Sequence, residues 1–357
     1  MEITEIRHLL HNNPGLSGDE HFAHDLVVAE LEALHPDELN THVGGFGVVA
    51  LWRSASADAK TLAFRADIDA LPSGHRCGHD GHCSILLDFA RRVASDNCRR
   101  NNMLLVFQPE EETGKGAKKI IDSGLLKKYG VDAIFGLHNL PGYEKGVVVL
   151  NRGTFAAASS GVIYSLRGRE THASTPEKGL NPGIAVAQII ERFDKLTVRK
   201  GSFFKFATLI CCRVGKEAFG TSAGSAELMF TLRCSTNEGM AELIRQADAI
   251  VLDIASEHSL GLEKQVREPF PATENTPEMS DRLMTLLAPN HNVVMETVPF
   301  RWSEDFGRYL LDIPGAFFGI GSGVEQPELH NPAYDFPDDI IPVAASCFET
   351  IMNEITI

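Results

Sequence analysis

The sequence is short of positive charge and has no long apolar run, and each absence excludes a class of protein. Its 357 residues include 33 lysines and arginines against 48 aspartates and glutamates, for a formal net charge of −15. Because nucleic acids and anionic membranes are bound through basic patches, we expect neither partner. No stretch approaches the roughly 18 to 20 apolar residues of a membrane span. The first residues also lack the apolar core and cleavage site of a signal peptide, so we expect a cytoplasmic protein.

Disulfide architecture is also unexpected. The seven cysteines are an odd number and are scattered without framework spacing, which is typical of reduced thiols in a cytoplasm. A buried free cysteine usually acts as a small apolar side chain, so a functional role needs support from its neighbours. Only Cys77 has such neighbours.

The chain is long enough for two domains, and its pattern of apolar residues changes along its length. Helical spacing over residues 21–35 is followed by β-rich segments that alternate with helix, which is typical of a sheet covered on both faces. These β-rich segments are 46–52, 61–64, 103–107 and 131–137, with a helix-like segment over 117–129.

A different order follows, and it predicts an inserted domain. Strand, helix, strand, strand, helix and strand succeed one another over residues 161–167, 181–196, 203–213, 226–234, 238–258 and 262–267. This βαββαβ order is that of a ferredoxin-like α+β domain. Residues 269–278 look like a linker, and the apolar segments then resume at 292–297, 316–320 and 341–353. We therefore predict an α/β catalytic domain over 1–158 and 271–357, interrupted by a second domain over 159–270.

The densest group of chemically active side chains is the motif CGHDGH, residues 77–82. Its cysteine and histidines offer metal donors from what we expect to be one tight loop. The motif follows a β-rich segment, and ligands of α/β sheets gather where strands end. The alternatives are a solvated loop and a nucleophilic Cys77 assisted by a histidine. Nearby carboxylates and additional histidines make the nucleophile the weaker interpretation.

Three consecutive carboxylates, Glu110 to Glu112, follow the apolar segment MLLVF. Close like charges are unfavourable unless something neutralises them. A bound cation explains them better than an acidic solvated loop does: one carboxylate would hold the ion while its neighbour handles a proton. The following TGKGAK lacks the spacing of a phosphate-binding loop.

Two single histidines complete the pattern. His138 follows a β-rich segment and His330 precedes Asn331 and Pro332 near the end of the chain. A lone histidine in such a place is more often structural than a ligand. Four potential donor groups at the ends of four apolar segments instead indicate a shared metal site.

Eight motifs occur in a fixed order: RHLLHNNPGLSGDE, RADIDALP, CGHDGH, QPEEETGKGA, GLHN, THASTPEKGLNP, SEDF and LHNP. With these motifs nearly the whole chain resembles the metal-dependent amidohydrolases related to aminoacylase and carboxypeptidase G. The most similar subgroup is that of hippurate hydrolases, auxin-conjugate hydrolases and N-acetyldiaminopimelate deacetylases. The resemblance implies a zinc-peptidase-like three-layer α/β/α domain with an inserted ferredoxin-like dimerisation (lid) domain.

The same resemblance implies an activity. It is the hydrolysis of the amide bond of N-acyl amino acids or similar small N-acyl substrates by a metal-activated water. A dipeptidase or carboxypeptidase of the same family and a binding homologue without turnover are the alternatives. Two divalent ions per chain are implied, zinc or manganese first and cobalt or nickel as further possibilities. The implied ligands are Cys77, His79, Glu112, His138 and His330.

Roles for other residues are implied in the same way. Glu111 matches the general base, and His172 matches a histidine that donates a hydrogen bond to the oxyanion in the active site of the partner subunit. That role requires a homodimer formed through the inserted domain. The implied residues around the ligands are Asp67, Asp69 and Asp80, and the implied substrate contacts are Asn139 and Gly321.

Three positions depart from the family pattern. Glu110 replaces the usual alanine, which makes the choice of base and ligand among the three carboxylates ambiguous by one residue. The segment before Cys77 is only Ser-Gly-His-Arg, which predicts a more open rim. Gly220 to Ala223 replace an Asn-Val-Ile-Pro motif, so the usual contact of that asparagine with the substrate is absent.

Overall fold

The computed structural model describes residues 1–96 and 99–357, which divide into two compact units. The first unit contains residues 1–155, 273–297 and 304–357, and the second contains 156–272 and 298–303. The sequence placed the domain boundaries at 158/159 and 270/271, and it did not predict the short return into the second unit at 298–303.

An eight-stranded mixed sheet forms the centre of the first unit, in the order β1-β2-β4-β3-β5-β17-β6-β16. The strands are β1 Glu38–Val43, β2 Gly47–Trp52, β3 Thr61–Asp67, β4 Asn102–Gln108, β5 Val131–Pro141, β6 Val148–Asn151, β16 Val293–Glu296 and β17 Gly315–Gly323. Strand β3 runs parallel to both β4 and β5, and β17 runs parallel to β5. The carboxyl ends of β3, β4 and β5 therefore meet at one edge of the sheet.

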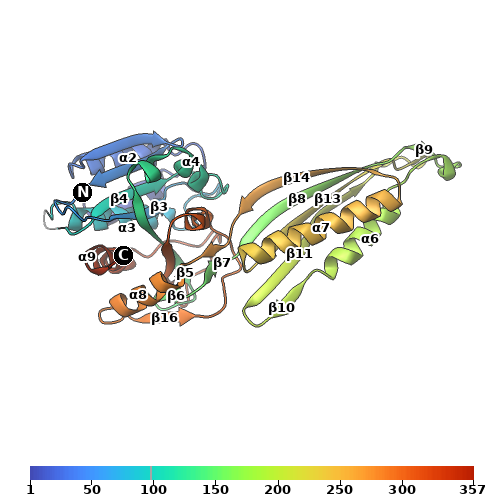
Figure 1. The fold of residues 1–357 in the computed structure, drawn as a ribbon. Helices are drawn as coiled ribbons and strands as arrows, with labels where there is room; N and C mark the ends of the chain where they lie inside the picture. The colour runs from blue at the N-terminus through green and yellow to red at the C-terminus, as the bar shows by residue number, and fades with distance from the viewer. Residues whose placement is uncertain (97–98) are drawn as a thin grey trace. The chain divides into compact units, whose positions relative to one another are not determined.

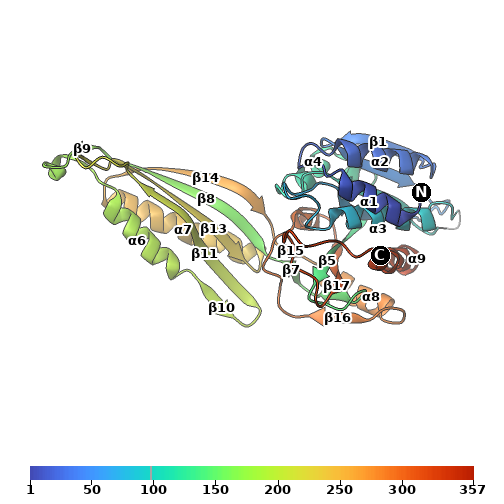
Figure 2. The ribbon, with the colours of Figure 1, turned by 180° about the vertical axis from the view of Figure 1, so that it is seen from behind.

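Helices cover both faces of this sheet, and its central strands are therefore buried on both sides. On β3, Phe64 packs against Phe89 and Phe348, with ring centroids 4.7 Å and 5.2 Å away, whereas Arg65 points to the opposite face. The first face carries α1 Ile3–Asn12, α2 His21–Glu32, α3 His79–Val93, α8 Pro277–Leu287 and α9 Ile341–Glu354 (Figures 1 and 2). The second face carries the helices α4 Gly116–Asp122, α5 Leu125–Lys128 and η2 Asp305–Leu311. This is the predicted three-layer α/β/α arrangement.

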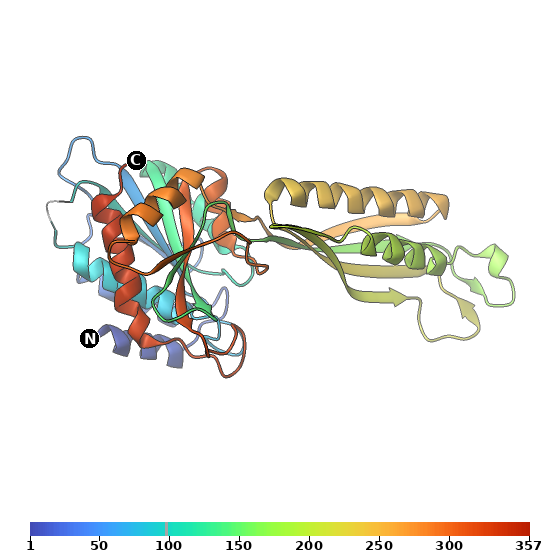
Figure 3. The ribbon, with the colours of Figure 1, turned by 90° about the horizontal axis from the view of Figure 1, so that it is seen from below.

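The second unit is a five-stranded antiparallel sheet in the order β10-β11-β13-β8-β14. Its strands are β8 Ala158–Arg167, β10 Val198–Lys200, β11 Phe203–Val214, β13 Ser225–Cys234 and β14 Gly261–Phe270. The helices α6 Gly183–Asp194 and α7 Asn237–Glu257 lie on one face (Figure 3). Alternate residues of β13, such as Leu228 and Phe230, are buried beneath them. The predicted ferredoxin-like order is confirmed, with β10 added as a short edge strand.

Two small ribbons accompany the sheets. β7 Thr154–Ala156 pairs with β15 Thr273–Glu274, and β9 Thr171–His172 pairs with β12 Thr221–Ser222. A short 3₁₀ helix, η1 Pro176–Lys178, follows β9, and η3 Asp338–Ile340 precedes α9. Among the residues that the structure describes, no helix is both long and apolar enough to cross a bilayer.

Some local predictions were wrong for identifiable reasons. The helix predicted over 117–129 is split into α4 and α5 because Gly124 adopts a left-handed conformation with φ of 75°. The predicted linker 269–278 contains the end of β14, the strand β15 and the start of α8, where Pro277 occupies the first turn. The helix α1 was not predicted.

Candidate metal centre

The predicted site residues lie where three neighbouring strands end. Strand β3 ends at Asp67, β4 ends at Gln108 just before the three glutamates, and β5 contains His138. Because these strands run parallel, the segments that follow them are brought to the same edge.

The sequence predicted that the CGHDGH motif forms one loop, but the structure shows that the motif is part loop and part helix. Cys77 lies in the loop, Gly78 caps α3 in a left-handed conformation with φ of 98°, and His79 is the first helical residue. His82 is three residues further along, so it lies on the same side of α3 as His79. The motif therefore starts a helix at the sheet edge, and Gly78 makes the turn because a side chain is unfavourable there.

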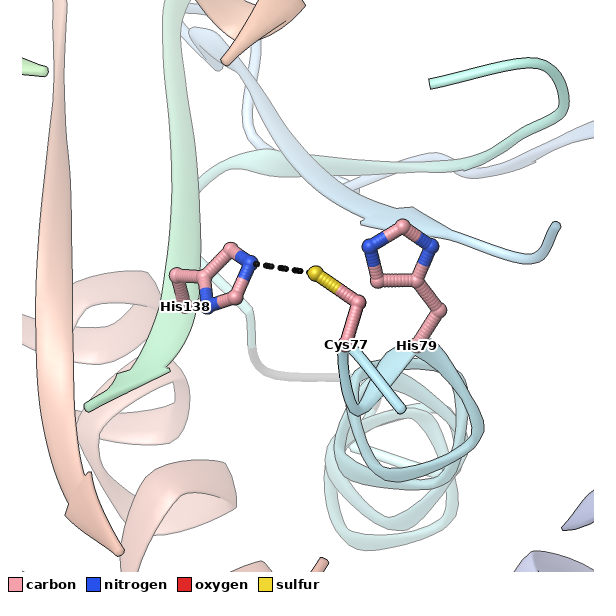
Figure 4. A group of neighbouring side chains, drawn as sticks. All are labelled: Cys77, His79 and His138. Atoms are coloured by element: carbon pink, nitrogen blue, oxygen red, sulfur yellow. Dashed lines mark hydrogen bonds between the residues drawn. The ribbon is translucent and has the colours of Figure 1, made fainter. Parts of the chain in front are cut away.

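All five predicted ligands come together. Donor atoms of Cys77, His79 and His138 lie within 4.8 Å of one another, and so do those of Cys77, Glu112 and His330. The Sγ of Cys77 is 3.6 Å from Nε2 of His138. Figure 4 shows the cysteine between a histidine from β5 and a histidine from the start of α3. A cysteine in this position can contribute to two neighbouring cation sites.

Hydrogen bonds direct the histidine rings toward this cluster. Nδ1 of His79 donates to the carbonyl oxygen of Asp69 at 3.0 Å, and Nδ1 of His138 donates to the carbonyl oxygen of Asn139 at 2.9 Å. In each ring Nε2 is left on the side of the other donors. Fixing one nitrogen so that the other binds an ion is the usual arrangement around metal-ligating histidines.

Two atoms of the cluster have no hydrogen-bond partner among the described residues. They are Nε2 of His79 and Oε1 of Glu112, both buried and 3.9 Å apart. Buried polar atoms without a partner are uncommon and require an explanation. A divalent ion between them would supply it, and the thiolate, imidazole and carboxylate donors suit zinc or a similar ion.

The neutral ring of His138 fits a cation ligand, whereas Cys77 needs the ion in order to ionise. Burial lowers the pKa of His138 well below its usual value, which leaves the ring neutral as a metal ligand must be. Burial raises the pKa of Cys77 well above its usual value. Without a cation this thiol stays protonated, whereas a bound divalent ion would deprotonate it.

Asp69 holds a proposed ligand in place, and Asp67 holds the neighbouring His82. Oδ1 of Asp67 accepts from Nδ1 of His82 at 2.6 Å, and Oδ2 of Asp69 accepts from the backbone N–H of Glu112 at 3.0 Å. Burial would raise the pKa of Asp67, but the charges of His79, His82 and Arg65 outweigh it and hold that pKa well below its usual range.

Asp80 lies elsewhere. Its Oδ2 accepts from Nδ1 of His11 at 2.7 Å and from Arg7 at 3.4 Å, so it fastens α3 to α1. It takes no part in the donor groups around Cys77. The structure thus gives Asp80 a structural contact in place of a position beside the ligands.

The three glutamates have different surroundings. Donor atoms of Glu111 and Glu112 lie within 4.8 Å of a ring nitrogen of His79. Glu110 turns away with φ of 54°, and its carboxylate pairs with Lys119. Burial, followed by the charges of Glu304, Glu112 and Asp305, raises the pKa of Glu111 well above its usual value. Burial raises the pKa of Glu112 to about 7.

His330 approaches from the loop after β17. Its Nε2 is 3.9 Å from Oε2 of Glu112, and its backbone N–H donates to the carbonyl oxygen of Arg76 at 2.8 Å. Its backbone has φ of 67°, and more than half of its side chain is exposed. It forms the solvent-facing side of the cluster.

The residues predicted to contact substrate have other contacts. Oδ1 of Asn139 is 2.6 Å from Nε2 of His82, and its Nδ2 donates to the hydroxyl of Tyr334. Gly321 lies in β17, where a side chain would overlap the carbonyl oxygen of Glu144. These contacts give both residues a role in packing around the site.

His172 lies in the second unit, on the ribbon of β9 and β12. It is exposed, and its Nδ1 accepts from the hydroxyl of Ser174 at 2.7 Å and from the Ser174 backbone N–H at 3.2 Å. The remaining proton of the neutral ring is therefore on Nε2, which can donate. Gly220 is adjacent, since its carbonyl oxygen accepts from the backbone N–H of Ala173.

Reasoning from the sequence missed three contributors to the site. His82 links Asp67 to Asn139, Arg65 bridges several carboxylates, and Tyr334 closes the network on Asn139. His82 and Arg65 are part of motifs that the sequence did single out, but Asn139 and Glu304, with which they pair, are 57 and 239 residues away.

Comparisons with known proteins identify the family and the fold. The model of Peptidase family M20/M25/M40 matches residues 63–354. A hippurate hydrolase of Campylobacter jejuni is 29% identical, with 97% of this chain and 94% of that protein covered. An N-acetyldiaminopimelate deacetylase of Lactobacillus helveticus is 27% identical, with 92% and 91% covered. The solved structure of a dinuclear metal binding peptidase from Bacillus subtilis superposes with a TM-score of 0.85 at 24% identity, covering 98% of this chain and 96% of that one.

The family match covers most of the chain, and the fold agrees with that of the solved structure over nearly its whole length. The relatives are likewise matched over nearly their full length, and their names include those that the motifs suggested. The chain therefore belongs to Peptidase family M20/M25/M40.

Proposed function

We propose that this protein is a dinuclear metal-dependent amidohydrolase that cleaves the amide bond of N-acyl amino acids or similar small N-acyl substrates. The observation that carries the proposal is the cluster around Cys77, in which two buried donor atoms face each other without a partner. The names of the relatives, a hippurate hydrolase and an N-acetyldiaminopimelate deacetylase, support an acylated amino acid as the substrate class.

The proposed ligands of the two ions are Cys77, His79, Glu112, His138 and His330. Two divalent ions bound there would polarise the amide carbonyl and lower the pKa of an attacking water. A thiolate with three imidazoles suits zinc, and manganese, cobalt or nickel also fit this donor set. The chain's contribution is to hold the donors, since Asp69 contacts both His79 and Glu112 from behind.

Glu111 is the proposed general base. Its carboxylate lies beside His79 and Glu112, and its Oε1 accepts from the backbone N–H of Asp305 at 3.4 Å. It would take the proton of the attacking water and then deliver it to the leaving amine.

His172 is proposed to act in the site of a partner subunit, in a homodimer formed through the second unit. Because Nδ1 of its exposed ring accepts from Ser174, the proton of the neutral ring is on Nε2, which can donate. That donor is suited to the negative oxygen that develops on the substrate carbonyl. A role in catalysis explains why an exposed histidine is held by two hydrogen bonds.

Metal analysis and a matched pair of variants test the proposal. Purified protein should contain close to two divalent ions per chain, and chelation should abolish hydrolysis of a panel of N-acetyl, N-benzoyl and indole-acetyl amino acids. Glu111→Gln should lower kcat by about 10²- to 10⁴-fold with metal retained. Glu110→Gln, one residue away and paired with Lys119, should leave kcat nearly unchanged.

Other outcomes would favour other functions. Turnover confined to dipeptides would indicate a dipeptidase, and metal binding without turnover on any amide would indicate a binding homologue. Activity that survived complete chelation but not thiol alkylation would indicate Cys77 as a nucleophile.

The role of His172 has its own test. Glu111→Gln and His172→Ala proteins, each inactive alone, are mixed, unfolded and refolded together. Mixed dimers should regain one working site if the histidine acts on the partner subunit. Absence of any recovery in dimers shown to be mixed would reject that role.

A further inference from the structure

A buried arginine pairs with two carboxylates that lie beside the proposed general base. Arg65 is on β3 and is almost completely buried. Its Nε donates to Oε1 of Gln108 at 2.9 Å, and one terminal nitrogen donates to Oδ2 of Asp67 at 2.6 Å. The other terminal nitrogen donates to Oε1 of Glu304 at 2.9 Å and to Oδ1 of Asp305 at 3.0 Å. Every nitrogen of the guanidinium therefore has an acceptor.

Glu111 stands on the other side of these two carboxylates. Carboxylate oxygens of Glu111, Glu304 and Asp305 lie within 4.8 Å of one another, and all three residues are buried. A guanidinium forms strong, charge-assisted pairs with carboxylates. Glu304 and Asp305 therefore contact Arg65 on one side and lie beside Glu111 on the other. A carboxylate held in an ion pair with an arginine is directed away from the water whose proton it would take.

Glu304 and Asp305 are held rigidly in this position. Oδ2 of Asp305 accepts from the backbone N–H of Ala117 at 2.9 Å, and its Oδ1 also accepts from Nε2 of Gln108 at 2.8 Å. Oε1 of Glu304 accepts from the backbone N–H of Phe306 at 3.1 Å, which caps η2. The donors of these bonds belong to β4, α4 and η2. They fix the orientation in which the two carboxylates contact Arg65.

We propose that Glu304 and Asp305 are positioning residues for the hydrolysis, which occupy the guanidinium of Arg65 and so keep the carboxylate of Glu111 out of an ion pair. The inference rests on the proposed function, in which Glu111 is the base. The proposed positioning role would explain why two further buried carboxylates lie beside the base. The backbone N–H of Asp305 is the one donor that this pair does offer to Glu111.

The first test is Glu304→Gln, which keeps the shape and the acceptor for Phe306 but removes the charge. One of the three carboxylates that neutralise Arg65 is then lost, so its positive charge acts more strongly on Glu111, and kcat should fall at least tenfold. KM and the metal content should stay within twofold, since no proposed ligand changes. Asp312→Asn is the matched control because Asp312 is an exposed carboxylate at the end of the same helix, η2. It should leave both kinetic constants unchanged.

A double-mutant cycle separates this role from a general loss of structure. In a Glu111→Gln background the charge of Arg65 has no base to pair with, so adding Glu304→Gln should lower the residual kcat by less than twofold. A tenfold fall that persisted in that background would overturn the inference. So would an unchanged kcat in the single variant, or a loss of bound metal.

Asp305→Asn removes the charge of the second carboxylate and should have the same effect on kcat as Glu304→Gln. Thermal unfolding shows whether both variant proteins are folded. If neither variant folds, the cluster is structural and the inference is wrong. Failure of the proposed function is distinguishable, because Glu111→Gln would then retain full turnover whatever happens at Glu304.

Discussion

Gly78 is the residue whose replacement most directly tests the geometry of the metal centre. It lies between the proposed ligands Cys77 and His79 with φ of 98°, and a Cβ built on it would lie 2.4 Å from Oδ1 of Asn139. Gly74 lies in the same segment with φ of 92°, but a Cβ there would meet nothing within 4 Å. Gly78→Ala and Gly74→Ala therefore introduce the same backbone strain, and only the first displaces a neighbour.

The expected magnitudes follow from this difference. A left-handed conformation costs a non-glycine residue about 1–2 kcal/mol, and this applies to both variants. In Gly78→Ala the side chain of Asn139 must also move away from His82 and Tyr334. Losing two hydrogen bonds of about 0.5–1.5 kcal/mol each adds roughly 1–3 kcal/mol. For a unit of this size that difference corresponds to a Tm about 2–12 °C lower than that of Gly74→Ala.

Thermal unfolding of both variants, followed by fluorescence in the presence of zinc, measures this difference. The metal content should also fall in Gly78→Ala alone, because Asn139 and His82 support the ligands and such supporting contacts are worth about 10- to 100-fold in metal affinity. Equal Tm values and equal metal content in the two variants would refute the assigned contact between Gly78 and Asn139.

Three further predictions concern stability. Removal of metal by a chelator should lower the Tm by several degrees, because it leaves buried atoms of His79 and Glu112 without a partner. Added zinc should restore the Tm, and a Tm that the chelator leaves unchanged would contradict the cation site. Burial raises the pKa of Glu20 from 4.5 to about 7, so the folded state holds this proton longer and stability should fall as pH rises between those values, by up to roughly 3 kcal/mol. Glu20→Gln should flatten that part of the profile of Tm against pH, and an identical profile would reject the shift. Phe64→Ala should lower the free energy of unfolding by about 3–5 kcal/mol in urea titrations, whereas Phe219→Ala, at a side chain 98% exposed, should change it little.

The fold was largely predictable because its signals are local. The β-rich segments are uninterrupted apolar runs between polar residues, and the ferredoxin-like order of the second unit follows from helical and alternating spacing. α3 was not predicted because nearly all of its residues are buried, so its sequence lacks a simple polar face. The helix begins after Gly78, whose left-handed conformation could not be predicted from the sequence.

The surroundings of the proposed base were less predictable. Arg65 belongs to the RADIDALP motif, but its partners Glu304 and Asp305 are 239 and 240 residues away in the chain. Only the fold brings them together. The choice among the three glutamates likewise depended on backbone conformation, since Glu110 turns to Lys119 by adopting a positive φ.

The short return of the chain at residues 298–303 limits how modular the second unit is. Arg301 lies over the rings of Phe204 and Phe206, and the carbonyl oxygen of Trp302 accepts from the backbone N–H of Ala157. A transplant of residues 156–272 alone would leave this segment behind and uncover those rings. Because Glu304 is the next residue along the chain after 303, recombination at this joint would also disturb the partner of Arg65. Exchange of the second unit between relatives therefore requires two segments, 156–272 and 298–303, to be replaced together rather than one.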